Sequence, residues 1–300
     1  MKRNVKNALV IAQKEFADHL WSPRFITLLS VFLLIIFSFS YKAALAGLNI
    51  FKMGFLDVSQ IIAVFLPFLG LALGFDAVIK ERKSGSLNVL LTHPIFRDDI
   101  ISGKILGSLA TLALIIGISI IASVGTMLFI SGMQINLLEI ERILIFAILT
   151  FIYISTFVGI SILISIYSKS TTSSLTYSIV VWINSIVVFS AIVAVIASIV
   201  TGQSYLDLGR NQHVLELNAD LQKFSPIHHY AEAVSGVPSL SWGGVSSDSG
   251  ADKSLGIFDT RHTLEQWLEE YWSNLVVLIT LPIALFTVSF MVFLRKDITM

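Results

Sequence analysis

The chain has 300 residues, of which 55% are hydrophobic and 13% are charged, and its formal net charge is zero. A soluble domain carries about 25% charged residues, so this composition predicts a membrane protein and argues against a nucleic-acid partner. The absence of cysteine excludes disulfides, thiolate metal sites and cysteine nucleophiles.

The first predicted element is an amphipathic helix within residues 1–24. Its apolar positions recur at helical spacing: Val5, Ala8, Leu9, Ala12, Phe16 and Leu20. Pro23 ends the helix, because proline disfavours helical geometry at the residue before it. We expect a helix lying in the membrane interface; the alternative is an ordinary amphipathic leader that only anchors the chain. No small-residue cleavage site follows the first apolar run, so we expect this segment to be retained.

Six later segments are long and apolar enough for the roughly 20 residues with which a helix crosses a bilayer. They are 25–45, 58–79, 105–131, 143–168, 174–201 and 274–294. Backbone polar groups have no partners in lipid, so each span must be helical. The predicted fold class is an all-α polytopic membrane protein with six transmembrane helices.

The distribution of basic residues predicts the orientation. Segments 1–24 and 80–104, with Lys169, Arg295 and Lys296, hold thirteen of the twenty lysines and arginines, and short loops rich in these residues stay in the cytoplasm. The connection 202–273 instead holds four basic and ten acidic residues. We therefore predict a plasma-membrane protein with both termini cytoplasmic and the connection 202–273 outside.

The connection 202–273 is the only part large enough for an independent soluble unit. Its middle, 235–256, is rich in serine and glycine and predicts loops, whereas 263–272 predicts a helix start with Thr260 or Thr263 as the N-cap. Four histidines fall in this connection: His213, His228, His229 and His262. Adjacent histidines can ligate a metal, but no recognised ligand spacing is present, so we expect surface or capping histidines.

The spans offer little chemistry for ion-driven transport. No ionisable residue lies near a span centre, and Lys42 and Arg142 are close enough to the interfaces to snorkel. Asn184 in the fifth span predicts either a substrate or helix contact, or an interhelical hydrogen bond. Small residues recur every four positions, which permits a dimer interface or packing within the chain; they are Gly70 with Gly74, and Ser190, Ala194 and Ser198.

The chain lacks a nucleotide-binding P-loop. Gly103-Lys104-Ile105 has Asp98 five positions before the glycine and no hydroxyl residue after the lysine. Any ATPase that drives this protein must therefore be a separate polypeptide.

The segment 80–104 is the most informative part of the sequence. A charged cluster at 80–83 is followed by the turn signal Ser84-Gly85-Ser86, by a short apolar stretch from Leu87 to Leu91, and by Pro94, which ends it. This pattern predicts a short helix that projects from the membrane and inserts in a groove. The alternative is a solvated loop whose apolar residues dip into the interface.

That pattern, continued by Thr92-His93-Pro94, Arg97 and Gly103-Lys104, resembles the signature of the ABC type-2 exporter permeases, as does the leader from Ile11 to Phe16. Within that family, Leu66-Pro67 and the stretch Phe75 to Val78 are most similar to the permeases for copper-site maturation of nitrous oxide reductase. The resemblance covers residues 5–110 best, and Ser225-Pro226 with Tyr230 also resembles a feature before the last helix of these permeases. The connection 202–273 is longer than expected for the copper-maturation members.

The resemblance implies a dimeric permease with a connecting helix at 1–24, spans at 25–201 with a coupling loop at 80–104, an extracytoplasmic region at 202–273, and a last span with a cytoplasmic tail at 274–300. It implies docking to an ATP-binding-cassette ATPase subunit, which holds ATP and magnesium, while this chain holds no cofactor. The residues expected to couple to the ATPase are Glu81, Gly85, Leu87, Leu90, Leu91, Pro94 and Arg97. The residues expected at a dimer contact or substrate path are Asn184, Ser190, Ala194 and Ser198. Other expected partners are a second permease copy, membrane lipid and an extracytoplasmic accessory protein.

Two other classes of function remain open at this point. A stand-alone receptor or scaffold would bind a partner through the acidic connection 202–273. An intramembrane enzyme ranks last, because the spans hold no paired acid and base and no set of metal ligands.

Overall fold

The computed structural model describes residues 5–45, 55–85, 95–132, 135–202, 212–237 and 256–296. These residues form helices and no strand. Six helical stretches within the described ranges are long and apolar enough to cross a membrane. The predicted all-α polytopic fold with six spans is confirmed.

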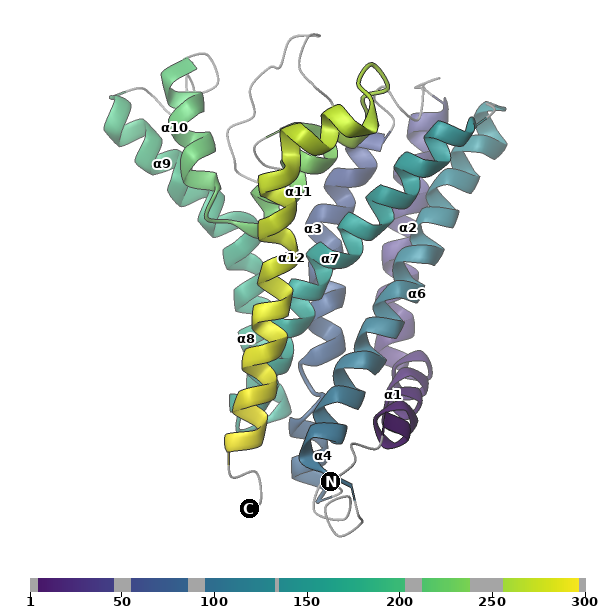
Figure 1. Cartoon of the computed structure of the whole chain (residues 1–300), viewed down its shortest axis with the longest axis vertical. Helices are drawn as coiled ribbons and strands as arrows, with labels where there is room; N and C mark the ends of the chain where they lie inside the picture. The colour runs from purple at the N-terminus through teal and green to yellow at the C-terminus, as the bar shows by residue number, and fades with distance from the viewer. Residues whose placement is uncertain are drawn as a thin grey trace.

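The helices follow one another as an up-and-down bundle (Figure 1). Their bounds are α1 Val5–Leu20, α2 Pro23–Leu45, α3 Phe55–Gly74, α4 Ile79–Ser84, α6 Arg97–Ser131, α7 Leu137–Tyr167, α8 Thr171–Ile183, the π-helix η2 Asn184–Val188, α9 Phe189–Thr201, α10 Gln212–Gln222, α11 Pro226–Ser235, the 3₁₀ turn η4 Gly256–Phe258 and α12 Leu264–Arg295. The start of α1 and the end of α12 lie at the same end of the bundle as α4 (Figure 1). We call this the termini end, and the opposite end, with α10 and α11, the distal end.

Several helix boundaries follow from local sequence signals. α1 ends at Leu20 and α2 begins at Pro23, as expected from a proline at the first helical position. Thr263 caps α12 and forms a capping box with Gln266, which confirms one of the two predicted N-caps. Because α12 runs from Leu264 to Arg295, the helix predicted to start at 263–272 and the last span are one continuous helix.

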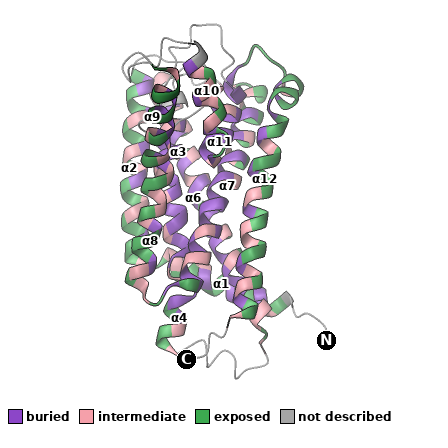
Figure 2. Ribbon diagram, turned by 90° about the vertical axis from the view of Figure 1, so that its left-hand side faces the viewer, coloured by how far each residue is buried: buried purple, intermediate pink, exposed green. Residues whose placement is uncertain are grey.

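The centre of the bundle is formed by α3 and α7, and α11 packs among them at the distal end. Tyr230 of α11 stacks on Tyr153 of α7 with ring centroids 4.4 Å apart, and the Tyr230 hydroxyl lies 2.9 Å from Oγ1 of Thr150. Figure 2 shows buried residues concentrated in the middle of the bundle and exposed residues along the outer faces of α9 and α12. A bundle whose outside is apolar and whose inside is packed is what a lipid environment requires.

The structure adds two features that were not predicted. Residues 75–78 form turns that divide the second span into α3 and α4. The connection 202–273 contributes α10 and α11, and α11 is buried against the spans. The predicted loop at 235–256 falls mostly on residues 238–255, outside the described residues.

Candidate functional site

A buried ion cluster joins three helices at the termini end. The ammonium group of Lys104, on α6, lies 2.7 Å from Oε1 of Glu15 on α1 and 3.0 Å from Oε2 of Glu81 on α4. Lys14 adds a second cation, 3.3 Å from Oε1 of Glu81. The Lys104 side chain is 1% exposed, so water screens these charges only weakly. The cluster fixes α1, α4 and α6 to one another.

Two glycines let α1 approach α6 closely enough to form this cluster. A Cβ atom on Gly103 would lie 2.6 Å from Cβ of Ile11, and one on Gly107 would lie 2.6 Å from Cβ of Glu15. Both distances are shorter than van der Waals contact, so any side chain there would push α1 outward. Gly103 and Gly107 are four residues apart on one face of α6, the spacing that permits close helix contact in membranes.

The turn between α3 and α4 is held by hydrogen bonds to α7. The hydroxyl oxygen of Ser165, on α7, accepts hydrogen bonds from the backbone N–H groups of Val78 and Ile79 at 3.0 and 3.2 Å. The Arg82 guanidinium donates to the carbonyl oxygen of Ser168, which follows α7. The short helix α4 is therefore bonded to α1 and α6 on one side and to the end of α7 on the other.

α4 leads directly into the predicted coupling loop. Gly85 ends it in the left-handed conformation with φ of 72°, which glycine adopts without steric cost. The predicted coupling residues Leu87, Leu90, Leu91 and Pro94 lie in 86–94, outside the described residues. Their contacts with an ATPase stay a prediction.

The other predicted coupling residues lie at the base of that loop. Glu81 is part of the buried ion cluster. Arg97, at the start of α6, donates a hydrogen bond of 3.2 Å to the carbonyl oxygen of Lys296 at the end of α12, so it ties the first turn of α6 to the last span. Lys104 and Glu15 were not among the residues predicted to couple to the ATPase. In the sequence, the four-residue spacing of Gly103 and Gly107, beside Lys104, indicates that another helix can approach closely there.

Two groups on α1 have shifted pKa values. Burial lowers the pKa of His19, and the nearby Asp76 carboxylate offsets part of that effect. Burial also disfavours the charged form of Lys14, but the Glu81 carboxylate, which interacts with it and accepts its hydrogen bond, raises the pKa of Lys14 overall. Lys14 therefore remains charged at neutral pH.

The residues singled out in the fifth span differ in their exposure. Asn184 is exposed on the outside of the chain, at the first residue of the π-helix η2, and π-helical turns often mark functional positions. Ser190 and Ala194, in contrast, are buried within the chain, and Ala194 packs in one cluster with Val214 of α10. These two residues therefore do not present themselves to a second copy. Ser198 is half-buried.

The other pair of small residues also packs within the chain. A Cβ atom on Gly70 would lie 2.7 Å from Cγ2 of Ile154, and one on Gly74 would lie 2.0 Å from Oγ of Ser161. Both neighbours belong to α7. Of the two alternatives for Gly70 and Gly74, packing between α3 and α7 is the one that the structure shows.

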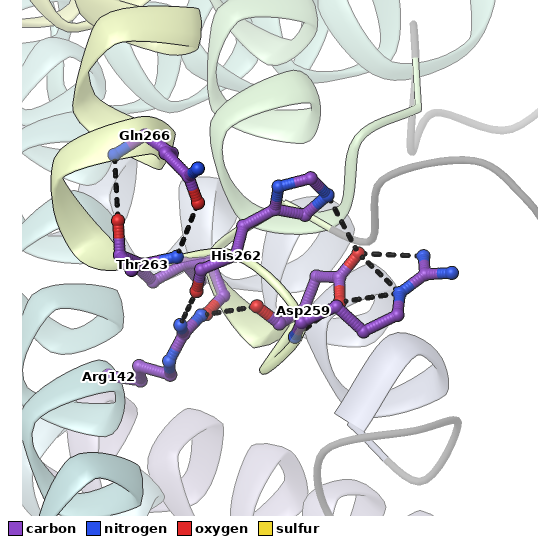
Figure 3. A network of polar contacts seen from close by, with 7 residues as sticks. Arg142, Asp259, His262, Thr263 and Gln266 are labelled. Carbon is purple, nitrogen blue, oxygen red and sulfur yellow. Dashed lines mark hydrogen bonds and ion pairs between the residues drawn. The ribbon is translucent and has the colours of Figure 1, made fainter.

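At the distal end, Arg142 of α7 holds the chain that leads into α12 (Figure 3). Its guanidinium donates to the carbonyl oxygens of Ile257 and Asp259 at 2.6 and 2.7 Å and to that of His262. The Asp259 carboxylate in turn pairs with Arg261 at 2.8 Å. Arg142, which was expected close enough to an interface to snorkel, is 5% exposed, and its partners are three backbone carbonyls.

The paired histidines are buried, so of the two alternatives expected for them, surface or capping, the surface one is wrong. His228 and His229 lie on α11 and are 1% and 8% exposed. His229 Nδ1 lies 2.6 Å from Oδ1 of Asn274, and its Nε2 lies 2.9 Å from the carbonyl oxygen of Lys223. Among the residues that the structure describes, no group of three histidine, aspartate or glutamate side chains could hold a metal ion.

Comparison with known proteins agrees with this architecture. The sequence is 28% identical over 137 residues to "Probable ABC transporter permease protein NosY" of Stutzerimonas stutzeri, covering 43% of this chain and 48% of that protein. It is 33% identical over 112 residues to the protein of the same name from Pseudomonas aeruginosa, covering 35% of this chain and 39% of that protein. The match thus spans about half or less of each relative's length.

The comparison with protein families covers almost the entire sequence. The family described as "ABC-2 family transporter protein" matches residues 9–298. This range includes all six spans and the four residues of the ion cluster, Lys14, Glu15, Glu81 and Lys104. The chain therefore belongs to the ABC-2 family of transporter proteins.

Proposed function

We propose that this chain is the membrane-spanning permease subunit of an ATP-binding-cassette exporter, whose separate ATPase subunit drives substrate export or work on the distal side. ATP and magnesium are held by that subunit. The observation that carries the proposal is the set of contacts that attach α4 to its neighbouring helices. The base of α4 is fixed through Glu81 to Lys104 and through Arg82 to Ser168, directly before the loop 86–94.

These contacts of α4 suit the transmission of a movement from the loop 86–94 to the bundle. An ATPase that binds the loop 86–94 and closes when it binds ATP would move α4. Because α4 is bonded to α1, α6 and the end of α7, these elements would move with it. The turn at 75–78, held by Ser165, is where the second span is divided into α3 and α4. A hinge between two packed elements is a common way in which a local movement becomes a rearrangement of a bundle.

The orientation follows from the same proposal. The termini end, with the cluster of Lys14, Glu15, Glu81 and Lys104, faces the cytoplasm, where the ATPase and its nucleotide are. The distal end, with α10 and α11, faces the other side of the plasma membrane. The excess of basic residues in 1–24 and 80–104 supports this orientation.

The fifth span supports assembly with a second copy. Lipid offers no hydrogen-bond partner, so an exposed amide within a membrane span favours contact with another polypeptide. The amide of Asn184 is both donor and acceptor, so two copies can satisfy each other across a two-fold axis. We therefore place the dimer face on α8, η2 and α9 around Asn184, with Ser190 and Ala194 on the side of that span that faces its own chain.

The test is reconstitution of the chain with ATP-binding-cassette ATPases from the same organism. We expect one of these ATPases to co-purify with the permease and the permease to change the rate of ATP hydrolysis. Leu90→Asp should abolish that change, whereas Phe224→Asp, the same kind of substitution at an 84% exposed residue on the distal side, should preserve it. Equal behaviour of the two variants, with ATP hydrolysis unaffected by either, would count against coupling and favour a stand-alone receptor or scaffold.

A further inference from the structure

An apolar groove of about 350 Å³ lies between α7 and α12 in the distal half of the bundle. Its walls include Ile148 and Ile152 from α7 and Leu268 and Ile279 from α12, and every lining residue is apolar. Ile148 and Leu268 are 58% and 51% exposed, so the groove opens to the outside of the bundle at these residues. None of its residues takes part in the ion cluster at the termini end.

The groove offers no hydrogen bond to an occupant. The one polar side-chain atom among its lining residues is the indole nitrogen of Trp267, and that N–H donates to the carbonyl oxygen of Ala233 at 2.9 Å. An occupant that carried polar groups into the groove would lose its hydrogen bonds to water without replacement, which costs several kcal/mol for each group. The part of the ligand that enters is therefore a hydrocarbon.

The length of the groove suits part of one acyl chain. Its lining residues run from Leu264 to Ile279 on α12 and from Ile145 to Ile152 on α7, which at 1.5 Å per residue is about 22 Å and about 10 Å. The hydrocarbon core of a bilayer is about 30 Å thick, so the part of the groove with both walls covers about two thirds of the hydrocarbon of one leaflet. Both walls belong to helices that are long and apolar enough to span the membrane, and the groove begins at the distal end of α12.

Charged residues lie at the mouth of the groove, next to its apolar lining, as the headgroup of a phospholipid lies next to its acyl chains. Arg261 and His262 directly precede α12, and their side chains are 52% and 47% exposed. The Arg142 clamp on the neighbouring carbonyls fixes this stretch in place (Figure 3). Glu265 and Glu269 are exposed on the first turns of α12, so the charges at the mouth are mixed, which suits a zwitterionic headgroup better than an anionic one.

We propose that this groove is a binding site for one acyl chain of a zwitterionic phospholipid in the distal leaflet, with its headgroup at the level of Arg261 and His262. The lipid fills the space in which α7 and α12 do not touch. The site depends on the membrane location of the chain and not on its coupling to an ATPase.

Photo-crosslinking tests the proposal. The full chain is placed in lipid nanodiscs that contain phosphatidylethanolamine with a diazirine in its acyl chain, irradiated, digested and mapped by mass spectrometry. We expect several-fold more labelling per residue in 145–152 and 264–279 than around Val31 and Leu34, which are equally exposed on α2. Uniform labelling of all lipid-facing helices would overturn the proposal.

Matched variants separate specific binding from general lipid contact. Leu268→Trp, or Ile148→Trp on the other wall, should fill the groove and reduce its labelling several-fold. Val276→Trp is the control, because Val276 is 49% exposed on the same helix but does not line the groove. Unchanged labelling in both groove variants would refute the site. Stronger labelling by a phosphatidylglycerol probe would refute the zwitterionic headgroup, and a groove that no lipid probe labels would show that protein covers it.

Discussion

The ammonium group of Lys104 lies 2.7 Å from the carboxylate of Glu15, although the two residues are 89 positions apart in the chain. This contact and the second bond of Lys104, to Glu81, mean that one buried cation neutralises carboxylates from two other helices. Burying such charges is costly, and the arrangement is stable only while all partners are present. The termini end of the bundle is therefore sensitive to the loss of any one of them.

Lys104→Met should destabilise the protein by about 3–5 kcal/mol, because it leaves Glu15 and Glu81 with too little positive charge in a buried site. The measurement is thermal unfolding of the purified protein, together with hydrogen exchange of α1. Lys80→Met is the control, since Lys80 is exposed on the adjoining helix α4. A small effect of Lys104→Met, no larger than that of Lys80→Met, would show that the cluster does not hold α1 in place.

Gly103→Ala should loosen α1 from α6. The new Cβ atom would meet Cβ of Ile11 at 2.6 Å and the carbonyl oxygen of Ala8 at 2.8 Å, and such overpacking costs about 1–3 kcal/mol. Hydrogen exchange of α1 should rise. Gly117→Ala on the same helix has open space around its Cβ atom and should be neutral or slightly stabilising. If the two variants exchange alike, the close approach is not needed for α1 to dock.

The stability of the α1 contact should fall at acidic pH through His19. Because burial lowers the pKa of His19, the unfolded chain binds a proton more tightly than the folded one. The contribution of His19 is therefore complete above its ordinary pKa of about 6.5 and is lost as pH falls through the lower folded-state value. The unfolding temperature measured from pH 8 to pH 5 should drop less in His19→Gln than in the original protein. Parallel curves for the two proteins would contradict this assignment.

Asn184→Cys should form a disulfide between two copies under mild oxidation in the membrane, because the proposal puts Asn184 near the two-fold axis. The chain contains no cysteine, so a single substitution reports on one position. Ile283→Cys is the control: Ile283 is 59% exposed, but it lies on α12, away from the proposed face. The readout is a band of twice the mass in non-reducing electrophoresis. Cross-linking at Ile283 with none at Asn184 would place the dimer face on α12 instead.

Arg142→Met should free the stretch that leads into α12. The change removes charged hydrogen bonds to three backbone carbonyls, each of the kind worth about 1.5–3 kcal/mol. We expect faster hydrogen exchange in 256–263 and a loss of about 3 kcal/mol or more in stability. Glu141→Gln, at the exposed neighbouring residue, should leave both unchanged. Normal protection of 256–263 in Arg142→Met would show that this clamp is dispensable.

Much of the fold follows from local sequence. Apolar runs of sufficient length predict the six spans, because a helix must bury its backbone in lipid whatever its neighbours are. Pro23 and Thr263 set helix boundaries through their own backbone and side-chain geometry. Residues 86–94 resemble the coupling segment of the family, and the family itself is confirmed by the match over residues 9–298.

Other features depend on which helices meet, and that information is not local. A hydropathy pattern treats Lys104 as an interfacial cation, and only the packing of α1 against α6 gives it buried carboxylates as partners. The burial of Ala194 in the fifth span depends on α10, because Val214 of α10 packs in one cluster with it. The sequence alone thus determined that the chain enters the membrane six times, since that depends on composition along each segment. Only the tertiary structure decided which charges, glycines and amides face one another, because those energies arise between residues far apart in the chain.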